Sequence, residues 1–305
     1  MRKAFVATLL ALAKRDSSIM LLTGDIGFNA LEEFRDTLPK QFLNCGVAEQ
    51  NMVSVATGLA LEGRKVFVYS IIPFVTFRCL EQIRDDVCYH NLPICITGVG
   101  AGYAYGILGT THHPIEDIGA LRSFPNLRIV TPGDPFETEA AVEAIVHDFH
   151  PTYLRLGKAG EPKLYPAKPD FAIGKVLVLQ QGTDVLFLAS GTMLETGQQA
   201  AAKLTEQGHS VHLVSVHSIK PFDEAFLLKQ ATSHKLSVTL EEHSIEGGLG
   251  SAAAETLSAL GTHAPLLRIG APDQFADIVG SQQFFRTKYG LTADAVSAKI
   301  QERLR

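Results

Sequence analysis

The chain has 305 residues, of which 46% are hydrophobic and 19% charged, and its formal net charge is -5. This length suffices for two ordinary α/β domains, each with its own hydrophobic core. No long run of one charge sign occurs, so the sequence offers no electrostatic footprint for nucleic acid or for an anionic membrane surface. The composition therefore favours small-molecule chemistry or a protein partner.

The first sixteen residues combine a basic start with a short apolar run. We interpret them as an amphipathic helix and not as a secretory signal, because a charged run at residues 14–16 follows at once and no small-residue cleavage site is present. No segment reaches the roughly 18 uninterrupted apolar residues that a membrane span needs. The four cysteines form no CxxC pair and lie in apolar sequence, which predicts buried thiols and fits a reducing cytoplasm.

Short β-rich apolar runs alternate with longer helical stretches along the chain. In order, the predicted strands cover residues 66–72, 93–97, 127–131, 176–179, 184–189, 211–216, 236–241 and 266–269. The predicted helices cover residues 48–61, 74–89, 135–147, 197–207 and 221–231. This alternation predicts an α/β fold of two doubly wound domains with mostly parallel sheets. A linker rich in proline, glycine and lysine is predicted at residues 160–172, which separates a first domain (1–165) from a second (172–305).

The most informative segment, residues 44–52, reads NCGVAEQNM and leads into the small-residue helix VSVATGLALEG. It places Glu49 at the start of a mostly apolar helix, in which Ala56, Gly58 and Ala60 allow close packing. We therefore expect this carboxylate to be partly desolvated, as functional carboxylates often are. The alternative is an ordinary glutamate at a helix N-terminus, favoured by the helix dipole.

Residues 69–78, YSIIPFVTFR, run from the end of a predicted strand into a helix. In open α/β sheets, this carboxyl edge is where ligands bind. Phe74 and Phe77 are spaced three residues apart, so they are candidates to stack on a flat ring, a contact that orients a ligand more than it holds it. The alternative is that both rings belong to the hydrophobic core.

Three further stretches carry candidate polar groups. The segment GTTHHPIED contains His112 and His113, whose side-chain type suits hydrogen bonding or proton transfer near neutral pH. Two adjacent histidines could also ligate a metal, but no further His or Cys follows at tetrahedral-site spacing. Asp25 ends an apolar strand in LTGDIG. Arg155 ends another in PTYLR, where its forked donors suit either an anion or a surface ion pair.

GVAEQNM, together with EEHSIEGGLGS at residues 241–251, resembles the transketolase family of thiamine-diphosphate enzymes, specifically its pyrimidine-binding and C-terminal domains. The resemblance implies that Glu49 is the catalytic carboxylate that bonds the cofactor's pyrimidine nitrogen and promotes its tautomerisation. It implies that Phe74 and Phe77 enclose that ring and that Asp25 lies near the thiazolium.

The same resemblance implies roles toward a sugar substrate. His112 would face the substrate as a catalytic hydrogen-bond donor or proton carrier, with His113 and Arg155 also binding the substrate. One departure concerns this region, because Leu108 stands where the family usually has Asp. Recognition of the sugar hydroxyls is therefore expected to differ from that in classical transketolases.

A second departure concerns the diphosphate and its Mg²⁺, which need oxygen ligands. The family supplies them through GDG and a later Asn, and TGDIG here is only a near miss. The resemblance thus implies a separate N-terminal transketolase subunit that supplies the metal ligands, in an α2β2 heterotetramer. The function it implies is transfer of a two-carbon ketol unit from a ketose, expected to be phosphorylated, to an aldehyde. The alternatives are the β subunit of a 2-oxoacid dehydrogenase and a noncatalytic scaffold.

Overall fold

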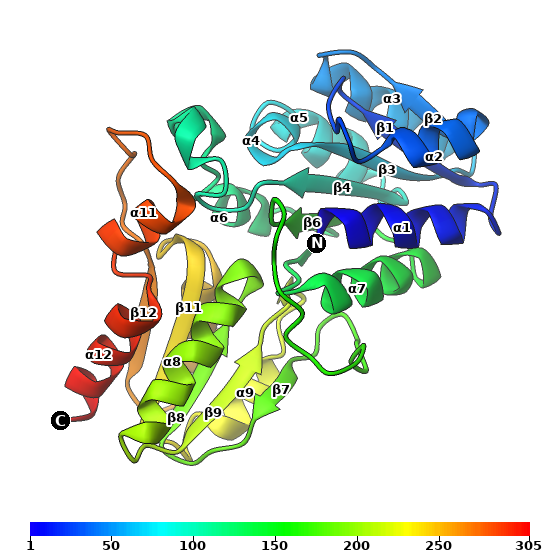
Figure 1. Cartoon of the computed structure of the whole chain (residues 1–305). Helices are drawn as coiled ribbons and strands as arrows, with labels where there is room; N and C mark the ends of the chain where they lie inside the picture. The colour runs from blue at the N-terminus through cyan, green and yellow to red at the C-terminus, as the bar shows by residue number, and fades with distance from the viewer.

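The computed structural model describes residues 1–305 and contains two sheets flanked by helices (Figure 1). The first sheet has seven strands in the order β10-β5-β6-β4-β3-β1-β2. Its strands are β1 (Ile19–Thr23), β2 (Phe42–Asn44), β3 (Lys65–Ile71), β4 (Ile94–Val99), β5 (Arg128–Val130), β6 (Thr152–Leu156) and β10 (Ser218–Lys220). The α-helices of this half are α1 (Arg2–Ala13), α2 (Glu32–Thr37), α3 (Glu49–Leu61), α4 (Ile72–Val75), α5 (Leu80–Gln82), α6 (Asp117–Arg122) and α7 (Pro135–His147).

The second sheet has five strands in the order β12-β11-β8-β9-β7. They are β7 (Leu177–Gln180), β8 (Val185–Ala189), β9 (Val211–Ser215), β11 (Leu236–Ser244) and β12 (Leu266–Ala271). The helices around it are α8 (Leu194–Glu206), α9 (Glu224–Gln230), α10 (Leu249–Leu257), α11 (Gln282–Lys288) and α12 (Ala293–Leu304). Single turns of 3-10 helix occur at η1 (Pro39–Gln41), η3 (Gly106–Leu108), η4 (Thr110–His112) and η5 (Gly191–Met193), and a π-helix at η2 (Ile83–Tyr89).

The central strands are buried along their whole length and mostly apolar, because helices cover both faces of each sheet. Strands β1, β4, β6, β8 and β9 are buried at every residue. All strand pairs are parallel except β10 with β5 and β7 with β9. The predicted fold class is therefore confirmed. Every strand predicted from the sequence is present. The predicted ranges omit β1, β2, β6 and β10, of which β1 and β6 are expected only as the strands that end near Asp25 and Arg155.

The helix predicted over residues 74–89 is wrong as a continuous element. The structure has α4, then α5, then the π-helix η2. The Thr76 hydroxyl bonds the carbonyl of Ile72, and the backbone N–H groups of Phe77 and Arg78 both reach the carbonyl of Pro73. Such side-chain and shared bonds interrupt a regular helical ladder. The break places Phe74 and Arg78 at the carboxyl edge of the sheet.

The N-terminal helix and the buried thiols agree with expectation. Helix α1 covers residues 2–13, and all four cysteines are free, three of them buried and Cys45 half-buried. Burial raises the pKa of Cys79, Cys88 and Cys95 to about 12. No helix is both long enough and apolar enough to cross a membrane.

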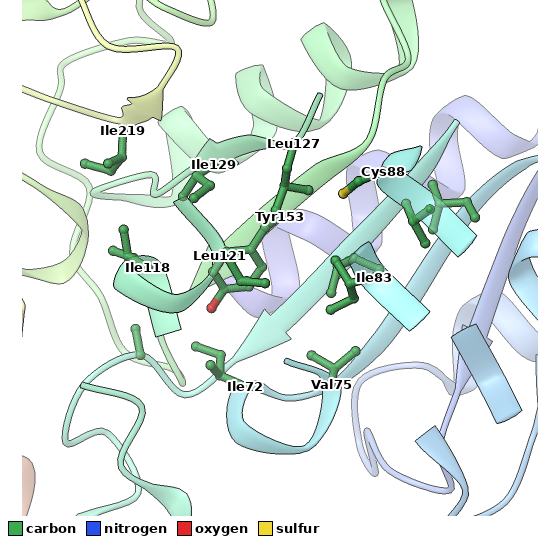
Figure 2. Packing of buried hydrophobic residues seen from close by; sticks show 14 of the residues in the cluster. Ile72, Val75, Ile83, Cys88, Ile118, Leu121, Leu127, Ile129, Tyr153 and Ile219 are labelled. Atoms are coloured by element: carbon green, nitrogen blue, oxygen red, sulfur yellow. The ribbon is translucent and has the colours of Figure 1, made fainter. Parts of the chain in front are cut away.

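The two halves share part of their core. Residues 157–176 carry no helix or strand, and the division into domains near residues 160–172 stays a prediction. The short strand β10 from the second half nevertheless joins the edge of the first sheet beside β5. Figure 2 shows Ile219 of β10 packed near Ile118 and Ile129 in one cluster of buried side chains. Elements of the second half are thus able to fix loops of the first.

Candidate functional site

Glu49 lies at the carboxyl edge of the first sheet. It is the first residue of α3 and only 2% exposed. The hydroxyl of Ser70, near the end of β3, donates to Glu49 Oε1 at 3.4 Å. Gly24, which follows β1, lies directly beside this side chain, since a Cβ there would lie 3.4 Å from Glu49 Cγ. The expected burial of this carboxylate is confirmed, and its catalytic role stays a prediction.

Arg78 covers Glu49 on the solvent side. Its Nη1 forms an ion pair with Glu49 Oε2, and its side chain is 44% exposed. The guanidinium carbon lies 4.6 Å from the centre of the Phe74 ring, within the range of a cation–π contact. A flat group with N–H donors therefore touches the buried carboxylate and the aromatic face at once.

His112 extends this constellation. Its ring meets Phe74 edge to face, with centroids 5.1 Å apart, and Tyr105 lies at 6.3 Å. The Thr111 hydroxyl lies 3.0 Å from His112 Nδ1, which leaves Nε2 for an external partner. Burial lowers the pKa of His112 below its ordinary value, so the neutral ring dominates at pH 7. Glu49, Arg78, Phe74 and His112 thus form one connected set.

Two predicted cofactor residues lie around this set without joining it. Phe77 is half-buried and makes no aromatic contact with Phe74 or His112. Asp25 is exposed with a φ of 56°, and its backbone N–H donates to Asn44 Oδ1 at 3.0 Å. The Asn44 amide in turn donates to Asp25 Oδ1 at 2.8 Å. Asp25 is thereby fixed at the same sheet edge as Glu49.

The two remaining predicted residues face the interior. His113 is 3% exposed, with Nε2 3.2 Å from the carbonyl oxygen of Gly106. Arg155 is 4% exposed, and its Nε and Nη2 donate to the carboxylate of Asp117 at 2.8 and 3.2 Å. Both side chains are thus bonded within this chain, and their substrate-binding roles stay predictions. The ion pair expected as the alternative for Arg155 exists, but it is buried.

Sequence reasoning missed Lys158, which lies just beyond the carboxyl end of β6. Its side chain is exposed and its Nζ lies 5.0 Å from the centre of the Tyr105 ring, the neighbour of His112. The signal was available, because a cation directly after a central strand stands at the ligand-binding edge. Arg78 was also missed, although it ends the quoted segment YSIIPFVTFR. No group of three or more His, Cys, Asp or Glu side chains is placed to hold a metal ion.

Comparison with known proteins identifies the family. Residues 1–161 match the transketolase pyrimidine binding domain, and residues 174–296 match the transketolase C-terminal domain. The chain belongs to the transketolase family. It is 39% identical to an apulose-4-phosphate transketolase subunit of Phocaeicola vulgatus over 97% of this chain and 94% of that protein. It is 34% identical to a putative transketolase C-terminal section of Methanocaldococcus jannaschii, over 100% and 96% of the two chains.

Solved structures agree with this assignment. A split gene transketolase, described as an inactive beta4 tetramer, superposes with a TM-score of 0.92 at 34% identity, over 99% of this chain and 97% of that one. A transketolase of Pichia stipitis superposes with a TM-score of 0.82 at 20% identity, which supports the fold alone. That match covers 99% of this chain but only 45% of the Pichia chain. The chain thus matches relatives named as a transketolase subunit or as a transketolase C-terminal section along nearly their whole length.

Proposed function

We propose that this chain is the C-terminal subunit of a split, thiamine-diphosphate-dependent transketolase that transfers a two-carbon ketol unit from a ketose to an aldehyde. The observation that carries the proposal is the buried carboxylate of Glu49, which Arg78 links to the Phe74–His112 pair at the carboxyl edge of the sheet. This arrangement, and relatives named as transketolase subunits, favour ketol transfer over the 2-oxoacid dehydrogenase and scaffold alternatives.

The residues present fit the aminopyrimidine of thiamine diphosphate. The position of Arg78 shows this fit, because its guanidinium is itself a flat group with N–H donors. It forms an ion pair with Glu49 and lies over the ring of Phe74. Glu49 and Phe74 are therefore spaced to hold a planar nitrogen heterocycle between them. When bound, the cofactor supplies the carbon nucleophile and the electron sink. The diphosphate and its Mg²⁺ are held by the partner subunit in this proposal.

Each residue of the set then has a definite task. Glu49 holds a proton at the pyrimidine ring nitrogen and excludes water from that contact. Phe74 orients the ring, and Arg78 swings toward solvent, which its 44% exposure permits. His112, neutral and with Nε2 free, donates or accepts a hydrogen bond at a substrate oxygen.

The proposal is tested by reconstitution. The purified chain is mixed with a transketolase N-terminal subunit, thiamine diphosphate, Mg²⁺, a ketose phosphate donor and an aldehyde acceptor, and formation of the shortened aldose and of the lengthened ketose is followed. We expect transfer only when both subunits and the cofactor are present. Full transfer by the chain alone contradicts the split-subunit proposal. Decarboxylation of a 2-oxoacid without ketol transfer favours the dehydrogenase alternative.

Lys158 is proposed to bind the anionic end of the substrate. It is an exposed cation beside the Tyr105–His112 pair. Two relatives are named for anionic sugars, apulose 4-phosphate and 6-deoxy-6-sulfo-D-fructose, the latter 34% identical over 99% of this chain. A subsite for a charged group beside His112 is consistent with both.

Replacing Lys158 by Ala is expected to raise KM for a phosphorylated donor about tenfold with little change in kcat. Loss of a hydrogen bond to a charged group costs about 1.5–3 kcal/mol of binding free energy. About 1.4 kcal/mol corresponds to a tenfold change in affinity. Steady-state kinetics at two salt concentrations measures the effect. Lys163→Ala is the matched control. Lys163 lies in the predicted linker, is also exposed, and also has its Nζ over an aromatic ring, that of Phe136. Equal KM values for the two variants contradict the assignment.

A further inference from the structure

The segment that carries His112, residues 100–113, is seated on the second half of the chain. We name it the histidine loop. Its residue Gly102 has a φ of +60°, and a Cβ there would lie 2.4 Å from Cγ of Glu242 in β11. The next N–H, that of Tyr103, donates to Glu242 Oε1 at 3.1 Å. The backbone of the loop therefore rests directly on one buried carboxylate, which is 2% exposed.

Glu242 is itself held by side chains of the second half. Arg286 Nη2 donates to its Oε2 at 2.5 Å, and Gln282 Nε2 lies 3.0 Å from each of its oxygens. The hydroxyl of Thr192 donates at 3.1 Å. Because these donors come from α11 and from the turn before α8, the carboxylate has one defined position. A buried charge with this many donors is a rigid support.

The far end of the histidine loop is anchored to the same half. The Thr110 hydroxyl donates to the carbonyl of Ala276 at 2.7 Å. The ring of His113 packs edge to face against Phe285, with centroids 5.1 Å apart. His112 lies between these two anchors, so its position relative to Phe74 depends on the second half.

We propose that Glu242 is a positioning residue that, through the N–H of Tyr103, holds the histidine loop so that His112 faces the substrate. The second half thereby contributes to substrate turnover at a site whose cofactor residues lie on the first half. This inference rests on the proposed role of His112. Glu49 and Phe74 make no contact with Glu242, so cofactor affinity is independent of it.

The main test is Glu242→Ala in the reconstituted complex. We expect kcat/KM for ketol transfer to fall about 100-fold, as misplacement of a catalytic group by about 1 Å can cause. The affinity for thiamine diphosphate, measured by calorimetry, stays within about twofold, because the Glu49 side of the site is unchanged. Hydrogen exchange of the loop amides accelerates. Glu242→Gln, which keeps an acceptor for the Tyr103 N–H, is expected to recover part of the activity and protection.

Two further variants separate positioning from general stability. Glu137→Ala removes an equally buried glutamate that bonds Gly133 and Tyr165 but not the histidine loop, and is expected to leave loop exchange unchanged. Gly102→Ala disturbs the same contact from the loop side, because its Cβ would lie 2.4 Å from Glu242 Cγ, and it keeps the Glu242 carboxylate in the chain. We expect it to reproduce the loss in kcat/KM and the faster exchange.

Two outcomes overturn the inference. One is wild-type kcat/KM and unchanged loop exchange in both Glu242→Ala and Gly102→Ala. The other is a parallel loss of cofactor affinity and turnover, as a purely structural role produces. If the wild-type complex shows no ketol transfer, the proposed function fails, and loop exchange in Glu242→Ala alone decides whether this carboxylate holds the loop.

Discussion

Glu49→Gln is expected to lower ketol transfer by about 10²–10⁴-fold in the reconstituted complex. General acid–base catalysis by a positioned carboxyl group contributes an effect of this size, and Gln keeps the shape of the side chain while losing its acid–base function. The variant should remain folded, because the partner left behind, Arg78, is 44% exposed and can be solvated. Initial rates at saturating cofactor measure the loss of activity, and thermal unfolding measures whether the variant remains folded.

Glu62→Gln is the matched control, since Glu62 follows the last residue of the same helix and is exposed. It should retain full activity. Undiminished transfer by Glu49→Gln would falsify the catalytic role. A wild-type complex with no transfer at all, in which Glu49→Gln also changes nothing, supports the noncatalytic scaffold.

Asp117→Ala is expected to destabilise the chain by about 3–5 kcal/mol, the usual cost of leaving one member of a buried ion pair without its partner. Asp117 is fully buried at the start of α6 and accepts bonds from Arg155 and from the Tyr153 hydroxyl at 2.5 Å. Arg155 further donates to the carbonyls of Pro114 and Glu242. Removal of Asp117 is therefore expected also to weaken the contact between the two halves, because Arg155 takes part in it. Denaturant unfolding of wild type and variant measures it.

The exposed pair Lys168–Glu143 supplies the control, since exposed pairs contribute about 0–1 kcal/mol. Glu143→Ala should thus leave the free energy of unfolding nearly unchanged. A double variant, Asp117→Asn with Arg155→Met, should lose less than the sum of the single changes, because it leaves no unpaired buried charge. A loss below about 1 kcal/mol for Asp117→Ala contradicts the structural role assigned to this pair.

The same pair predicts how stability depends on pH. Burial alone raises the pKa of Asp117, but the charge of Arg155, with His243 and two hydrogen bonds, holds it below its ordinary value. A lowered folded-state pKa contributes stability that is present above the unfolded value and is lost as pH falls through the folded one. We therefore expect acid to weaken the wild type more than the Asp117→Asn, Arg155→Met double variant, as unfolding at several acidic pH values would show.

Much of the site was visible in the sequence because its signals are local. Glu49 opens a helix of small residues and Phe74 follows the carboxyl end of β3, so parallel topology brings both to one edge, while His112 stands out as part of a polar motif in the loop after β4. The sequence says less about residues whose surroundings are not local. Arg155 looked available to an anion because its partner Asp117 is 38 residues away, and that pair forms only when β6 and α6 pack together.

By itself, the sequence determined the parallel α/β class and most of the strands, and it singled out Glu49 as the candidate carboxylate, since each follows from short-range periodicity or a contiguous motif. Only the tertiary structure decided that Arg78 lies over Phe74, that Lys158 and not Arg155 is exposed at the sheet edge, and that Glu242 supports the loop of His112. The physical reason is distance along the chain. Glu242 and Tyr103 are 139 residues apart, and their contact exists only once both sheets have packed around a shared core.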